Sequence, residues 1–132
     1  MTASSIPQIL MIDDDHDLRR IYARYLSAEG FEVSEAGSTA EALQSFPGKK
    51  FEVILLDIRI QESDGSQFLP VLRQRYPHTP VIVFSCHSVE IQKEMVGKAA
   101  DYFDKSSGCR ALLSKIRTLL SIPVPQGEAN LT

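Results

Sequence analysis

Residues 53–57 read Val-Ile-Leu-Leu-Asp, four apolar residues that end in a carboxylate. A near-continuous apolar run rich in β-branched residues predicts a strand that is buried on both faces. Two further runs of this kind stand at residues 9–12, Ile-Leu-Met-Ile, and at residues 81–84, Val-Ile-Val-Phe. Because strands buried on both faces belong to parallel sheets covered by helices, these runs predict an α/β domain.

Amphipathic segments lie between and after these runs and predict helices. Apolar residues recur at helical spacing over residues 18–26 and again over residues 112–120. Residues 38–41, Ser-Thr-Ala-Glu, have the sequence of a capping box, so they predict a helix start. Residues 47–48, Pro-Gly, would end that helix.

Start and stop signals predict two more helices. One begins at Asp64 or Ser66 and ends before Pro77. The other begins at Ser88, and it carries the apolar residues Ile91, Met95 and Ala99. Both follow an apolar run, as a parallel sheet requires of its crossover helices.

Weaker strand signals at residues 31–35 and 102–103 complete a series of five strands, each followed by a helix. Right-handed crossovers then require a parallel sheet with helices on both faces, which is a doubly wound α/β domain. We expect this domain to cover residues 8–121, with flexible tails at residues 1–7 and 122–132.

Length and composition exclude several classes of protein. The chain has 132 residues, enough for one domain, and its 14 Lys and Arg against 17 Asp and Glu give a net charge of −3. Without a basic stripe, direct nucleic-acid binding is disfavoured. No apolar run approaches the roughly 20 residues of a membrane span, and no signal peptide is present, so we expect a cytoplasmic protein. The two cysteines, Cys86 and Cys109, are expected to be free thiols.

Charged and polar residues end the predicted strands. Asp13 and Asp14 follow the first strand, Asp57 ends the third, Ser85 follows the fourth run, and Lys105 follows the fifth. The carboxyl ends of parallel strands meet at one edge of the sheet, here called the carboxyl edge, where ligands bind. Carboxylates about 4 Å apart repel by roughly 4 kcal/mol, so the edge calls for a hard divalent cation such as Mg²⁺.

Each of these residues also has a plain structural interpretation. An aspartate after a strand is commonly a helix N-cap, which is the interpretation that we favour for Asp15. Serines and lysines are common where loops begin, and Phe84 is interpreted as a strand residue of the core. Only the ordered set of aspartates, serine and lysine at successive strand ends is specific.

The ordered set and its surroundings resemble the receiver domain of response regulators in two-component signalling. The resemblance covers roughly residues 9–120 and rests on LMIDDD, on VILLD followed by Asp-Gly, on VIVFS and on ADYFDK. It implies a flavodoxin-like fold, (βα)5, with five parallel strands in the order 2-1-3-4-5.

The resemblance also implies a role for each site residue. Asp57 would be the phosphoacceptor that takes a phosphoryl group from a phosphohistidine. Asp13 and Asp14 would hold Mg²⁺ together with Asp57 and the backbone carbonyl of Arg59. Lys105 would pair with a phosphoryl oxygen.

Two further positions would form a switch. The hydroxyl of Ser85 would move toward the phosphoryl group, and Tyr102 would then turn inward, which alters the surface around the fourth helix, the last strand and the last helix. One departure from the family concerns the lysine, because Ser106 follows Lys105 where proline is usual. A cis bond before serine costs about 3 kcal/mol, so we expect a trans peptide there.

The predicted function is that of a phosphorelay response regulator, which is not an enzyme beyond phosphotransfer and autodephosphorylation. The expected phosphoryl donor is a sensor histidine kinase or a histidine phosphotransfer protein. No DNA-binding segment follows Leu120, so output would pass through an unknown protein target. A homodimer through the fourth and last helices stays open, as does whether the chain is a whole regulator or part of one.

Three alternatives compete with this prediction. A pseudo-receiver would bind partners without being phosphorylated, which the intact set of site residues argues against. A phosphatase of the haloacid dehalogenase type would need a different sequence after its first aspartate than Asp-Asp-His-Asp at residues 14–17. A flavodoxin would need a phosphate loop rich in serine, threonine and glycine, whereas the carboxylates of residues 13–17 would repel a phosphate.

Overall fold

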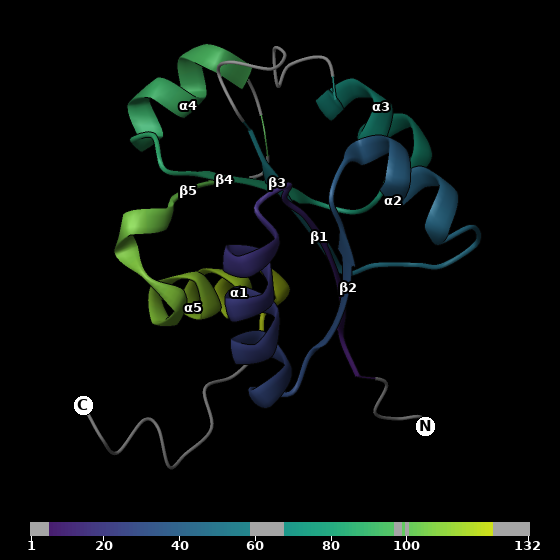
Figure 1. The fold of residues 1–132 in the computed structure, drawn as a ribbon, viewed down its shortest axis with the longest axis horizontal. Helices are drawn as coiled ribbons and strands as arrows, with labels where there is room; N and C mark the ends of the chain where they lie inside the picture. The colour runs from purple at the N-terminus through teal and green to yellow at the C-terminus, as the bar shows by residue number, and fades with distance from the viewer. Residues whose placement is uncertain (1–5, 59–67, 97–98, 100, 123–132) are drawn as a thin grey trace.

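Five parallel strands form one sheet in the order β2-β1-β3-β4-β5, which confirms the predicted topology (Figure 1). A computed structural model describes residues 6–58, 68–96, 99 and 101–122. The strands are β1 Gln8–Ile12, β2 Glu32–Ala36, β3 Val53–Asp57, β4 Val81–Ser85 and β5 Asp101–Asp104. The helices are α1 His16–Ala28, α2 Thr39–Ser45, α3 Phe68–Arg75, α4 Val89–Val96 and α5 Cys109–Leu120, with a 3₁₀ turn, η2, at Lys105–Ser107.

The sheet separates two apolar cores. Side chains alternate along each strand, so Ile9 and Met11 pack on one face while Leu10 and Ile12 pack on the other. Helices α1 and α5 cover the first face, and α2, α3 and α4 lie on the second (Figure 1). The central strands are buried from both sides, as their apolar runs predict.

Capping side chains fix where α1 and α2 begin. The carboxylate of Asp15 accepts a hydrogen bond from the backbone N–H of Leu18 at 3.1 Å, so the predicted N-cap is confirmed. The hydroxyl of Ser38 accepts from the N–H of Glu41 at 3.0 Å, which is one half of the capping box. The Glu41 carboxylate accepts from the N–H of Gly37 at 2.7 Å. The return bond therefore reaches one residue further back than the motif predicts.

Helix α4 differs from its prediction in the face that it buries. Ile91 is 42% exposed, whereas Gln92 is fully buried. The side-chain amide of Gln92 donates hydrogen bonds to the carbonyls of His87, at 2.8 Å, and Phe103, at 2.7 Å. These two carbonyls select a donor at this buried position, so the helix turns its glutamine inward and leaves Ile91 outside.

The ends of the other predicted elements agree with the structure where it describes them. Helix α3 ends before Pro77, the peptide bond between Lys105 and Ser106 is trans, and Cys86 and Cys109 are free. Three predictions fall outside the described ranges: the helix start at Asp64 or Ser66, the carbonyl ligand Arg59, and most of the tails at 1–7 and 122–132. Within those ranges no helix is long and apolar enough to cross a membrane.

Candidate functional site

Three carboxylates meet at the carboxyl edge of the sheet. Asp13 and Asp14 follow β1, and Asp57 is the last residue of β3, the strand paired beside β1. One carboxylate oxygen from each lies within 4.8 Å of the other two. Asp13 is buried and Asp14 is exposed, so this acidic cluster opens to solvent on one side. The convergence follows from parallel pairing of adjacent strands.

Hydrogen bonds hold both the carboxylate and the backbone carbonyl of Asp13. One carboxylate oxygen accepts from the N–H of Asp15 at 2.9 Å, and the other accepts from the ammonium of Lys105 at 2.8 Å. The Asp13 carbonyl accepts from the guanidinium of Arg19 at 2.7 Å, and Arg19 is itself paired with Glu35 at 3.0 Å. Arg19 and Glu35 are supporting residues that the sequence analysis missed.

Lys105 bridges two of the carboxylates. Its ammonium lies 2.8 Å from an oxygen of Asp13 and 3.2 Å from an oxygen of Asp57, and its side chain is only 7% exposed. Burial disfavours the charge on Lys105, but the nearby carboxylates of Asp57 and Asp13 outweigh that cost and raise the pKa of the lysine. The lysine is therefore a fixed positive charge at the cluster.

Asp57 carries the strongest electrostatic perturbation of the site. Its side chain is 7% exposed, and its pKa is raised to about 7. Burial is the main cause, and the charge of Asp13 adds to it, while Lys105 acts in the opposite direction. Two buried carboxylates, those of Asp13 and Asp57, share the ammonium of Lys105. An all-oxygen donor set of this kind fits a hard divalent cation of the Mg²⁺ class.

Ser85 and Tyr102 lie on strands next to this cluster. Ser85 is buried, and its hydroxyl donates to the carbonyl of Ile58 at 3.3 Å and accepts from the N–H of His87 at 3.2 Å. The Tyr102 hydroxyl accepts from the N–H of Ala99 at 3.0 Å, and its ring packs against the core on the face that α2, α3 and α4 cover. Both side chains are tied to the segments that flank α4.

Two aromatic residues contact Lys105, and neither was predicted to belong to the site. The ammonium lies 4.7 Å from the ring centroid of Phe84, and the hydroxyl of Tyr22 donates to the Lys105 carbonyl at 3.2 Å. Phe84 is therefore more than the plain core residue predicted. The strand order carries a signal for it, because a lysine after β5 must pass the end of β4 to reach β3.

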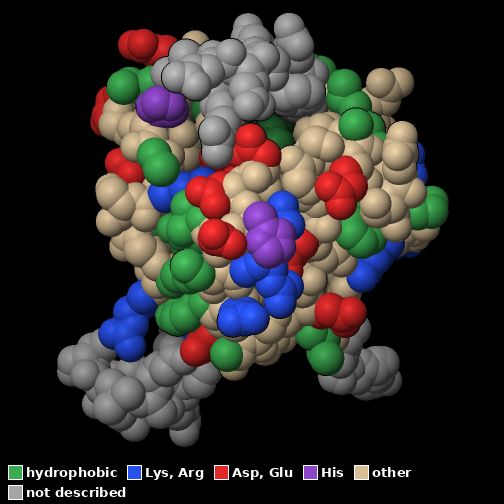
Figure 2. All heavy atoms as spheres, in the orientation of Figure 1, with side chains coloured by type: hydrophobic (Ala, Val, Ile, Leu, Met, Phe, Trp, Pro, Cys, Tyr) green, Lys and Arg blue, Asp and Glu red, His purple; other side chains and the backbone are tan. Residues whose placement is uncertain are grey.

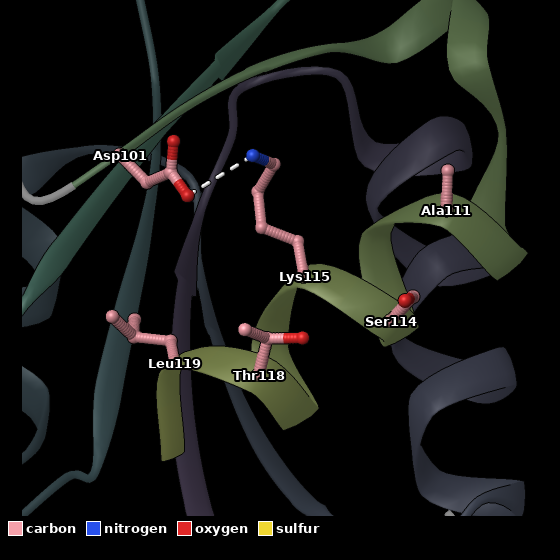
Figure 3. A pocket seen from close by; sticks show the side chains of 6 residues that line it. All are labelled: Asp101, Ala111, Ser114, Lys115, Thr118 and Leu119. Atoms are coloured by element: carbon pink, nitrogen blue, oxygen red, sulfur yellow. Dashed lines mark hydrogen bonds and ion pairs between the residues drawn. The ribbon is translucent and has the colours of Figure 1, made fainter. Parts of the chain in front are cut away.

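The surface around the site has mixed charge. Figure 2 shows acidic side chains gathered near the start of α1, with Lys and Arg side chains beside them over the helix. A separate cavity of about 520 Å³ lies between β5 and α5, where Lys115 pairs with Asp101 at 3.0 Å (Figure 3). Its lining includes no member of the acidic cluster, so the two sites are distinct.

The fold and the acidic cluster define a doubly wound α/β domain with a carboxylate site at the carboxyl edge of its sheet. The sequence model of the response regulator receiver domain matches residues 9–117, so the chain belongs to this family. Receiver domains are signalling domains of two-component systems, which confirms the resemblance drawn from the strand-end motifs.

Relatives and solved structures agree with this family. A putative response regulator NtrX-like of Rickettsia bellii is 36% identical over 76% of this chain and 22% of its own length. The transcriptional regulatory protein SrrA of Staphylococcus aureus is 32% identical over 92% of this chain and 52% of its own. The crystal structure of a CheY-like receiver domain protein from Methanospirillum hungatei has a TM-score of 0.75 at 27% identity, over 89% of this chain and 95% of that one. The chain thus spans about half or less of these curated relatives.

Proposed function

We propose that Asp57 accepts a phosphoryl group from a phosphohistidine and that the aspartyl phosphate switches a protein-binding surface. The observation that carries this proposal is the buried carboxylate of Asp57, joined to Lys105 at 3.2 Å and clustered with two further carboxylates. A buried nucleophile beside a fixed cation and a potential metal site has what phosphoryl transfer needs, since that reaction depends on positioning and charge neutralisation.

Asp13, Asp14 and Asp57 would hold Mg²⁺, which when bound neutralises carboxylate and phosphoryl oxygens during transfer. The raised pKa of Asp57 describes the protein without metal, where part of the population is protonated near pH 7. A protonated carboxyl is not a nucleophile, so the cation and the proton compete for Asp57. The backbone carbonyl of Arg59, which lies outside the described residues, stays a predicted further ligand.

Phosphoryl transfer would form one bond to phosphorus and break another. A carboxylate oxygen of Asp57 forms a bond to phosphorus while the P–N bond of the phosphohistidine breaks. The imidazole leaves with the electron pair of that bond and takes up a proton from water. Lys105 exchanges its contact with Asp57 for one with a phosphoryl oxygen, because a charge-assisted hydrogen bond to the new dianion replaces one to a carboxylate that has been consumed.

Ser85 and Tyr102 would transmit the change. To reach the phosphoryl group, the Ser85 hydroxyl gives up the carbonyl of Ile58, to which it donates at 3.3 Å. Tyr102 is held by the N–H of Ala99 and by Lys93, whose ammonium lies 5.8 Å from the ring centroid. Inward rotation of Tyr102 would release the contact with Lys93 in α4 and the contact with Ala99, which follows the helix. The protein-binding surface that the switch alters would be formed by α4, β5 and α5.

The partners follow from this chemistry and stay predictions. The donor would be a sensor histidine kinase or a histidine phosphotransfer protein, and the target an unidentified protein. The net charge of the 132 residues is −3, so we do not propose direct contact between them and nucleic acid. Dimerisation through α4, β5 and α5 is the second way in which the altered surface could act.

Intact-protein mass spectrometry tests the proposal. Wild type and Asp57→Asn are incubated with acetyl phosphate, or with phosphoramidate as a small P–N donor, with Mg²⁺ or with EDTA. We expect one gain of about 80 Da, in wild type with Mg²⁺ alone. Asp14→Asn, which leaves Asp57 intact, should need a higher Mg²⁺ concentration for the same gain.

A gain of equal size in Asp57→Asn would show that another group accepts the phosphoryl. No gain from either small donor and none from phosphohistidine donor proteins would favour the pseudo-receiver alternative, in which the cluster serves binding alone.

A further inference from the structure

We infer that Tyr22 and Phe84 are positioning residues that hold Lys105 against the acidic cluster. The inference deepens the proposed function, since it concerns the lysine that would meet the phosphoryl group. It rests on contacts from α1 and β4 that the strand-end motifs do not reveal.

Phe84 supports the charged end of Lys105. Its ring is fully buried, and the lysine ammonium lies over it, 4.7 Å from the centroid. A cation over a ring face is attracted by the ring quadrupole, more so when water is excluded. Asp57 is the register partner of Phe84 on the neighbouring strand, so the ring lies beside the strand end where the lysine meets its carboxylate.

Tyr22 supports both Phe84 and the backbone of Lys105. Its ring meets Phe84 edge to face, with centroids 5.8 Å apart and planes at 89°. Its hydroxyl donates to the Lys105 carbonyl at 3.2 Å. A buried tyrosine needs a partner for its hydroxyl, and here the partner is the residue whose ammonium lies on the next ring.

The turn that carries Lys105 is closed by its own hydrogen bonds. The Asp104 carboxylate accepts from both the N–H and the hydroxyl of Ser106, at 2.9 and 2.8 Å, and the Lys105 carbonyl also accepts from the N–H of Gly108 at 3.2 Å. These bonds shape the turn but do not tie it to the rest of the domain. Tyr22 connects this turn to α1.

Lysine has a long flexible stem, and ordering such a side chain costs conformational entropy. The Tyr22 hydroxyl holds the backbone carbonyl of Lys105, and the Phe84 ring supports its ammonium. Because the lysine is already ordered in this way, less conformational entropy is lost when a ligand binds. Preordered charge lowers the barrier to a reaction that depends on positioning. Loss of either contact should therefore slow phosphoryl transfer without removing the lysine.

The first test is independent of phosphorylation. NMR resonances of the Lys105 side chain are assigned with Lys105→Arg, and the ε-methylene protons are compared with those of Lys115. We expect the Lys105 protons upfield of the Lys115 protons, because the ε-methylene carbon is bonded to the ammonium nitrogen that lies over the Phe84 ring. Phe84→Leu should abolish the difference, and Tyr22→Phe should reduce it. Equal shifts for the two lysines in wild type would overturn the inference, with no variant needed.

The second test measures labelling by acetyl phosphate at saturating Mg²⁺. Tyr22→Phe removes one hydroxyl and keeps the ring, so labelling should slow by roughly two- to tenfold, the range that one neutral hydrogen bond corresponds to. The control is Tyr25→Phe, a partly buried tyrosine of the same helix and core, which should label like wild type.

The outcomes separate the two proposals. If neither the small donors nor a phosphohistidine donor protein labels wild type but the Lys105 protons are shifted, the phosphoacceptor proposal fails and the positioning inference stands. If wild type is labelled and Tyr22→Phe labels at the same rate, the inference is overturned and the phosphoacceptor proposal stands.

Discussion

Two lysine–aspartate contacts lie near opposite ends of β5, and they differ in almost everything except distance. Lys105 meets Asp13 at 2.8 Å and Asp57 at 3.2 Å, and all three side chains are at most 7% exposed. Lys115 meets Asp101 at 3.0 Å, with side chains 31% and 38% exposed (Figure 3). Distance alone would rank them as equals.

The two contacts differ in burial, and burial determines how much each contributes to stability. An exposed ion pair is screened by water and contributes about 0–1 kcal/mol to stability. In a buried pair, loss of one partner leaves the other charge unsolvated, which costs far more. The buried group also has more carboxylates than ammonium groups, so it is poised to take up a cation or a proton. The contact with unbalanced charge is the one suited to function.

The largest effect is expected for Lys105→Met. The variant leaves Asp13 and Asp57 buried without their cation, so the free energy of unfolding should fall by about 3–5 kcal/mol at pH 8. Urea denaturation in EDTA measures it. The loss should shrink at pH 5, where Asp57 is protonated. A loss that is the same at both pH values would assign the effect to packing.

Asp57→Asn should change stability in the opposite direction. The pKa of Asp57 is about 7 in the folded protein and near 3.8 when unfolded, so the folded state binds more protons between these values. Stability therefore falls as pH rises from about 4 to about 7, by up to about 4 kcal/mol. Above pH 7 in EDTA the asparagine variant should be more stable than wild type by up to that amount, and below pH 4 the two should converge. Denaturation curves of both proteins across pH measure this difference in stability. If stability changes with pH in the same way in wild type and in Asp57→Asn, the buried charge of Asp57 is not the cause.

These two variants act on residues whose convergence the sequence predicts. Asp57 and Lys105 stand at strand ends, and the parallel sheet brings strand ends together whatever the details of packing. The hydrophobic pattern alone does not reveal the roles of Phe84 and Gln92. An apolar residue in a strand indicates core, and a polar residue in a helix indicates solvent, so neither pattern shows that Phe84 lies under an ammonium or that Gln92 is buried.

A buried polar group without charge separates burial from electrostatics in the comparison. Gln92→Leu keeps the volume but leaves the carbonyls of His87 and Phe103 without their donor. We expect a loss of about 2 kcal/mol that does not change between pH 5 and 8. The matched control is Gln74→Leu at an exposed position of α3, and that substitution should change stability little. A strongly pH-dependent loss in Gln92→Leu would mean that α4 is coupled to the titration of Asp57.

The smallest effect belongs to the exposed pair. Lys115→Met removes a contact with Asp101 that water screens, so stability should change by less than about 1 kcal/mol, and less again in high salt. Thermal denaturation at low and at high ionic strength measures both the stability change and its dependence on salt. A loss comparable to that of Lys105→Met would contradict the ranking by burial.

Locating the phosphoryl group on the chain shows which residue accepts it. After incubation with acetyl phosphate and Mg²⁺, borohydride reduces an aspartyl phosphate to homoserine, and trypsin releases residues 51–59, which contain Asp57. We predict homoserine at position 57, in samples with Mg²⁺ and not in samples with EDTA. Homoserine at position 13 or 14 would contradict the assignment of Asp57 as the phosphoacceptor, as would the absence of any reduced residue when acetyl phosphate and a phosphohistidine donor protein have each been supplied with Mg²⁺.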